Sequence, residues 1–109
     1  MGWKVKFYQT ERGELPVKEF ISQLETPTRS KIDSYFNLLA SQGPWLKPPY
    51  AKKLQSGLYE LRISGKETVR ILYTMVNNEY YLLHVFKKQS QKTPQKELKT
   101  AIDRTKDLI

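Results

Sequence analysis

The 109-residue sequence contains no cysteine and a single histidine, His84. Without thiols it can form no disulfide scaffold, no thiolate metal site and no cysteine nucleophile. One histidine excludes a zinc site built from several histidines and argues against a nuclease that uses a histidine pair. GxGxxG, Walker and Gly-x-Ser-x-Gly motifs are also missing. The sequence therefore predicts a protein without a metal centre or a cofactor.

Long apolar runs are absent as well. No stretch approaches the ~20 apolar residues that a membrane helix needs. Residues 1–6 alternate polar and apolar side chains and do not resemble a signal peptide. We therefore expect a cytoplasmic protein with no membrane partner. No linker or internal repeat divides the chain, so residues 1–109 are predicted to form a single domain.

Positive charge is what the sequence has in excess. It carries 19 Lys+Arg against 11 Asp+Glu, for a formal net charge of +8. Such a surplus favours an anionic partner, whether nucleic acid, an acidic protein or anionic lipid. The alternative is a soluble domain with a solvated lysine surface. Hydrophobic residues make up 39% of the chain, which is enough for a packed core.

The first half of the chain predicts one strand and two helices. Residues 3–7 alternate apolar and polar side chains, as a strand with one buried face does. Apolar residues then recur with helical spacing in residues 16–24 and again in residues 26–42, where Gly43 ends the pattern. Because so few residues connect them, the two helices are expected to pack as an antiparallel hairpin.

The second half predicts three strands and a last helix. Residues 44–51 are rich in proline and read as an extended connector. Strands are expected over residues 58–63, 68–76 and 79–87, and a helix is expected to begin at Pro94. The predicted order is β-α-α-β-β-β-α, an α+β fold with a largely antiparallel sheet and the helical hairpin on one face.

Turn geometry predicts which side chains share a face. Residues 77–78 are Asn-Asn, which suits a two-residue turn with positive φ. Continued along both strands, the register that this turn sets places Arg70 and Lys87 on one face. A three-residue turn at 65–67 places Arg62 opposite Arg70 on that same face.

These cations predict an anion site. Like charges on one sheet face repel each other, and Glu60 is available to offset the repulsion. The alternative is a solvated face with a Glu60–Arg62 pair. Lys52 and Lys53 precede the first of these strands and are expected at the rim of the same cavity. His84 falls on the opposite face, where we expect a core histidine with one hydrogen bond.

Arginine and lysine side chains suit the cleavage of RNA. A guanidinium group binds two phosphate oxygens at once and stabilises the charge of the phosphorane. A lysine crowded by other cations has a lowered pKa and can transfer protons near neutral pH. Lys87, placed beside Arg70 and Lys88, is the predicted proton-transfer residue.

Four segments resemble one known family: residues 52–62 (KKLQSGLYELR), 69–73 (VRILY), 84–88 (HVFKK) and 91–94 (QKTP). Together they are similar to the RelE/ParE superfamily of type II toxin–antitoxin toxins, and in particular to its HigB-like, phage Gp49-like branch. The resemblance covers essentially the whole chain and implies a RelE-like fold.

The resemblance implies a metal-independent endoribonuclease that cuts mRNA on the ribosome and is neutralised by an antitoxin, often of the helix-turn-helix type. The catalytic residues expected on this basis are Arg62, Arg70 and Lys87. The RNA-binding residues expected are Lys52, Lys53, Lys88 and Lys92.

The sequence departs from the family pattern in one respect. Some members carry a tyrosine or histidine after the last strand, but neither residue type occurs between Lys88 and Pro94. The general base is therefore not identified by resemblance. Two other functions stay open: a ParE-like inhibitor that binds DNA gyrase without chemistry, and a non-catalytic basic RNA-binding domain.

Overall fold

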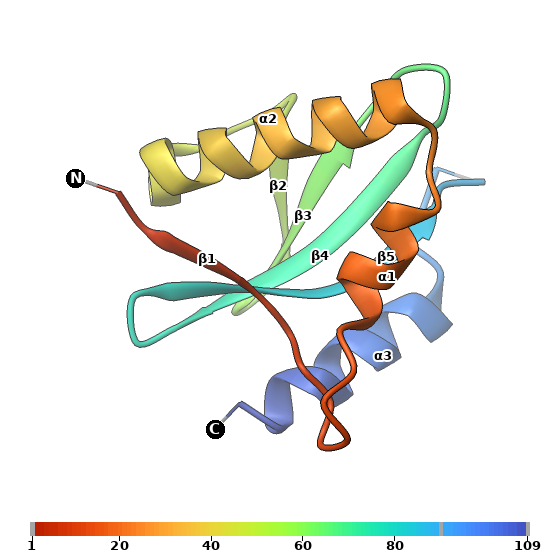
Figure 1. Cartoon of the computed structure of the whole chain (residues 1–109). Helices are drawn as coiled ribbons and strands as arrows, with labels where there is room; N and C mark the ends of the chain where they lie inside the picture. The colour runs from red at the N-terminus through yellow and green to blue at the C-terminus, as the bar shows by residue number, and fades with distance from the viewer. Residues whose placement is uncertain (1, 90, 109) are drawn as a thin grey trace.

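A five-stranded mixed sheet forms the centre of the computed structural model, which describes residues 2–89 and 91–108 (Figure 1). The predicted α+β class is confirmed. In the part of the chain described, no helix is long and apolar enough to cross a membrane. The elements, in chain order, are β1 (Lys4–Phe7), α1 (Pro16–Ser22), α2 (Thr26–Gln42), the short 3-10 helix η1 (Gly43–Trp45), β2 (Ala51–Gln55), β3 (Leu58–Ile63), β4 (Val69–Val76), β5 (Glu79–Lys87) and α3 (Gln95–Lys106).

The strands lie in the order β1-β5-β4-β3-β2. The pairs from β2 to β5 are antiparallel, whereas β1 runs parallel to β5. Four strands follow the helices, so the predicted count of three was wrong. The additional strand, β2, lies at the edge of the sheet and exposes Lys52 and Lys53. Exposed lysines are common on edge strands. Where they occupy successive positions, the strand lacks the alternation of apolar and polar residues from which a strand is predicted.

The helices α1 and α2 cover one face of the sheet, as predicted. Val17 and Ile21 of α1 and Ile32 and Leu39 of α2 are buried in the same core cluster. The two helices do not form the predicted antiparallel hairpin, because α1 runs steeply across the direction of α2 (Figure 1). Each helix buries its apolar stripe against the sheet rather than against the other helix.

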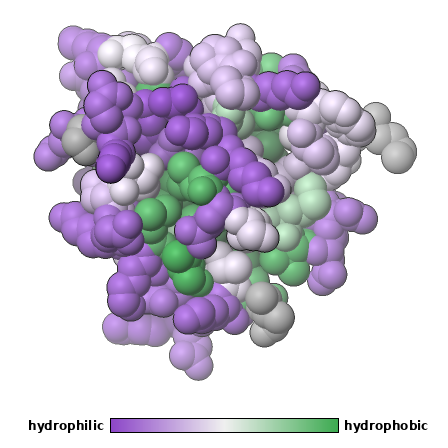
Figure 2. Space-filling model, turned by 180° about the vertical axis from the view of Figure 1, so that it is seen from behind, coloured by the Kyte–Doolittle hydropathy of each residue, from purple (hydrophilic) through white to green (hydrophobic). Residues whose placement is uncertain are grey.

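The third helix, α3, covers the other face of the sheet. Its Ala101 is completely buried, and Leu98 and Ile102 pack against the same cluster. Figure 2 shows the molecule from behind: hydrophilic side chains cover most of the surface, and hydrophobic side chains are visible in its middle and toward one side. The buried residues of this second cluster are Tyr8, Leu58, Leu72, Leu83, Phe86 and Ala101.

The hairpin of β4 and β5 begins as predicted. Asn77 and Asn78 have φ values of 51° and 65°, and the turn that they form pairs Val76 with Glu79. Both asparagines therefore adopt the left-handed conformation that this turn type requires.

A β-bulge then changes the register of the hairpin. Tyr73 pairs with Leu82, but the next residue back, Leu72, pairs with His84. Leu83 is therefore an additional residue on β5, and a shift of one residue exchanges the two faces of the strand. Beyond the bulge, Arg70 lies opposite Phe86 rather than opposite Val85.

Candidate anion-binding site

Glu60 lies between two arginines on the face of the sheet that α3 covers. Arg62 of β3 and Arg70 of β4 are directly opposite each other, which confirms the predicted pairing. Their Nε atoms each lie 3.7 Å from Oε1 of Glu60. Glu60 and Arg70 are buried, with 4% and 5% of their surfaces exposed. The carboxylate therefore offsets the repulsion between the two guanidinium groups.

Arg70 is held beneath the segment that leads into α3. Its Nη1 donates a hydrogen bond to the carbonyl oxygen of Val69 at 3.2 Å. Burial lowers the pKa of Arg70, with Glu60 opposing this and Arg62 adding to it, yet a guanidinium group stays charged in a protein. Above it, the hydroxyl of Thr93 donates to Oε2 of Glu60 at 2.9 Å. Thr93, which was not among the predicted site residues, thus joins the last connecting segment to β3.

Arg62 is more open than Arg70, since 32% of its side chain is exposed. Within the described chain, its Nε is buried and has no hydrogen-bond partner. Lys52 lies opposite Glu60 in the register of β2 and β3, on the same face. Arg62 and Lys52 line a hollow of about 250 Å³, which we call the basic hollow; its other lining residues are Leu54, Gln55, Glu60, Gln91, Lys92, Thr93 and Leu98.

Lys88 joins the arginines at the end of β5. With Glu60 and Arg70, it lines a narrow gap beside the basic hollow. Desolvation lowers the pKa of Lys88, and the positive charges of Arg70 and Arg62 lower it further. These charges therefore make the proton of Lys88 easier to lose.

Lys87 points to the opposite side of the sheet. It pairs with Val69 in the register, and its Nζ lies 3.0 Å from Oε2 of Glu67. The other oxygen of Glu67 accepts a hydrogen bond of 2.7 Å from Thr28 of α2. The prediction that Lys87 shares a face with Arg70 was wrong because the bulge shifts the register between the turn and these residues.

Lys53 and His84 also lie on faces other than those predicted. Lys53 pairs with Tyr59 and faces away from the basic hollow, on the side of α1 and α2. His84 faces α3, because the bulge precedes it: its Nε2 lies 2.7 Å from Oε1 of Glu97, and its ring stacks on Phe86. The hydrogen bond expected for His84 is confirmed, but its predicted face was wrong.

Fold and site together describe an α+β protein with a cluster of cations around one buried carboxylate. The chain belongs to the phage-derived Gp49-like protein family (DUF891), whose model matches residues 19–106. This family is part of the RelE/HigB-like toxin group, which confirms the resemblance seen in the sequence. A search of curated proteins found no match.

Proposed function

We propose that this protein is the toxin of a type II toxin–antitoxin system, that it cuts mRNA on the ribosome, and that a cognate antitoxin, of the helix-turn-helix type, neutralises it. Membership of the Gp49-like family supports the toxin class. The main structural support for nuclease activity is the basic hollow. There Arg62 and Lys52 face an opening beside the buried Glu60–Arg70 pair.

The phosphate of the scissile linkage binds at Arg62. About a third of its side chain, 32%, is exposed, so part of this side chain is open to a ligand. Lys52 and Lys92 line the same opening and attract the neighbouring phosphates of the chain. Arg70 does not touch RNA in this scheme. It holds Glu60 in place and adds positive charge from below.

Lys88 transfers the proton in the proposed reaction. In its neutral form it takes the proton from the 2′-hydroxyl of the ribose, and the 2′-oxygen then forms a bond to phosphorus. The bond between phosphorus and the 5′-oxygen breaks, and water protonates the leaving oxygen. The products are a 2′,3′-cyclic phosphate and a 5′-hydroxyl end. Arg62 stabilises the additional negative charge of the phosphorane.

Expression in bacteria, with the 5′ ends of cellular RNA mapped by sequencing, tests this function. We expect the wild-type protein to stop growth and to produce new mRNA ends, and Arg62→Ala to abolish both. The matched control is Lys99→Ala, which removes a cation on the exposed surface of α3 and leaves the activity unchanged.

Two outcomes would overturn the proposal. Growth arrest with intact mRNA and with DNA damage signalling would assign the protein to the gyrase inhibitors. RNA binding without growth arrest or new mRNA ends would leave a non-catalytic RNA-binding protein.

A further inference from the structure

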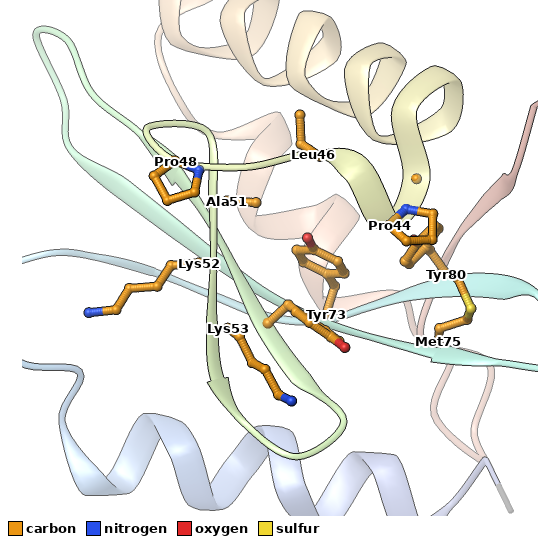
Figure 3. Close-up of a pocket in the computed structure, with 11 residues that line it drawn as sticks. Pro44, Leu46, Pro48, Ala51, Lys52, Lys53, Tyr73, Met75 and Tyr80 are labelled. Carbon is orange, nitrogen blue, oxygen red and sulfur yellow. The ribbon is translucent and has the colours of Figure 1, made fainter.

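A second cavity lies on the other face of the sheet, away from the arginines. It measures about 350 Å³ and lies between the sheet and the segment that follows α2 (Figure 3). Tyr73 stands at its centre, with Pro44 and Leu46 on one side and Lys53 on the other. We call it the tyrosine pocket; the residues that line it are Gly43, Pro44, Leu46, Pro48, Ala51, Lys52, Lys53, Tyr59, Tyr73, Met75 and Tyr80.

The wall of the tyrosine pocket is built from aromatic rings. Tyr59 and Tyr73 stack with their centroids 5.5 Å apart and their planes inclined by 24°. Tyr80 meets Tyr73 edge-on at 5.6 Å. Tyr73 and Tyr80 are buried, whereas Tyr59 is half-exposed. The stack therefore ends in a planar ring that a second flat group can extend.

The rim of the tyrosine pocket is basic. Lys52 and Lys53 line it, and none of its described lining residues is acidic. The connector that forms its outer wall interleaves aromatic and basic residues, and it exposes 68% of Trp45 and 39% of Tyr50. Exposed rings among lysines are typical of surfaces that bind single-stranded nucleic acid.

The tyrosine pocket and the basic hollow lie on opposite faces of the sheet, and the edge strand β2 contributes lining residues to both. Lys52 lines both of them, and Lys53, the next residue, faces only the tyrosine pocket. In Figure 3, the side chain of Lys52 points away from Tyr73. A flexible polyanion that passes over β2 therefore meets cations on both sides of the strand.

We propose that the tyrosine pocket binds one unpaired nucleobase of the RNA whose backbone lies in the basic hollow. The base stacks on Tyr59, Lys53 binds the phosphate beside it, and tyrosine hydroxyls are available to the edge of the base. A nucleotide is favoured over an acidic peptide as the ligand because it has both a planar base that can stack on the tyrosine rings and a phosphate that the lysines can bind. This inference rests on the proposed function and adds a second contact to it.

The test uses a 2′-O-methyl adenosine hexamer, which cannot be cut because its 2′-oxygen cannot attack. The methyl group of Met75, which lines the pocket, reports binding in NMR spectra through the ring current of the base. We expect the hexamer to shift this signal and to bind roughly 5- to 100-fold more tightly than an abasic hexamer with the same number of phosphates.

Two pairs of variants locate the contact. Tyr59→Leu is expected to lose the preference for bases, whereas Tyr81→Leu, which removes a tyrosine from the other core cluster, keeps it. Lys53→Gln weakens binding several-fold without touching the core. Lys66→Gln removes an exposed lysine that pairs with Glu25, and it is expected to change little.

Equal affinity for the base-containing and abasic hexamers would overturn the inference. So would a Met75 signal that moves with hexaglutamate but not with the adenosine hexamer, since the pocket would then take an acidic peptide. The proposed nuclease fails separately, when the wild-type protein leaves cellular mRNA uncut although the hexamer shifts Met75 as expected.

Discussion

Lys87 and Lys88 are neighbours in sequence, but their side chains act on opposite sides of the sheet. Lys87 pairs with Glu67 near α2, at 3.0 Å, and Lys88 lies with Glu60 and Arg70 around the gap beside the basic hollow. This separation gives a matched pair of variants in which the same charge is removed from two environments.

Lys88→Met is expected to reduce mRNA cleavage by about 100-fold or more, which is the usual contribution of a general base. Lys87→Met is expected to stay within about threefold of the wild type. Initial rates of cleavage of a ribosome-bound mRNA measure both effects. A larger loss in Lys87→Met than in Lys88→Met would contradict the assignment of the proton-transfer residue.

The pH dependence of cleavage follows from the same lysine. Its lowered pKa means that the neutral form gains population below the ordinary lysine value of 10.5. We expect the wild-type rate to rise with pH up to that lowered pKa and the residual rate of Lys88→Met to lack this rise. A pH–rate profile on a short RNA substrate checks it, and an identical profile for both proteins would argue against Lys88.

Glu60→Gln is expected to destabilise the protein by about 3 kcal/mol, because it leaves the buried guanidinium group of Arg70 without its counter-charge. Urea denaturation measures the change. The control is Glu25→Gln, an exposed partner of Lys66 at 3.7 Å, whose removal costs about 0–1 kcal/mol. Equal effects of the two substitutions would show that the buried carboxylate does not hold the arginines.

Glu67→Gln tests a pH-dependent contribution to stability. Hydrogen bonds from Thr28 and then Lys87 hold the pKa of Glu67 below its ordinary value of 4.5. A group with a depressed folded pKa contributes stability above its unfolded pKa and loses it as the pH falls through the folded one. The wild type is therefore expected to be the more stable protein at neutral pH, with the difference shrinking below pH 4.5. Thermal denaturation of both proteins at a series of pH values measures this difference in stability. A difference that does not change with pH would contradict the prediction.

Gly43 and Gly57 form another matched pair. Gly43 has a φ of 52°, and a Cβ atom there would lie 2.6 Å from ring carbons of Trp3. Gly57 has a φ of 77°, with nothing within 4 Å of the added atom. Gly43→Ala is therefore expected to cost about 2–4 kcal/mol, from backbone strain and overpacking, and Gly57→Ala about 1 kcal/mol, from strain alone. Urea denaturation measures the loss of stability in both variants. Equal losses would show that the Trp3 side chain moves aside at no energetic cost.

Local patterns predicted the helices and the hairpin turns because their signals lie within a few residues. The pairing of Arg62 with Arg70 followed from a short turn and is confirmed. The bulge at Leu83 lies several residues beyond the turn at Asn77, in a run of apolar residues with no signal of its own. It alone reverses the faces of His84 and Lys87.

Other parts of the site depend on contacts that span the chain. The edge strand β2 exists because β3 offers it a partner, and its lysines show no alternation that predicts it. The bond from Thr93 to Glu60 joins residues 33 positions apart. Such contacts depend on how the elements pack and not on any short segment of sequence. The burial of Arg70 beneath residues 91–93 therefore could not be predicted from the sequence.

The parallel pairing of β1 with β5 also has a consequence for how the chain reaches its native state. Lys4 is aligned with Glu79, so the first strand finds its partner only after most of the polypeptide has left the ribosome. Contacts between such distant segments form slowly, because a large loop must close first. The hairpin of β4 and β5 is therefore expected to assemble before the amino-terminal strand docks, leaving Val5 and Phe7 unshielded during synthesis.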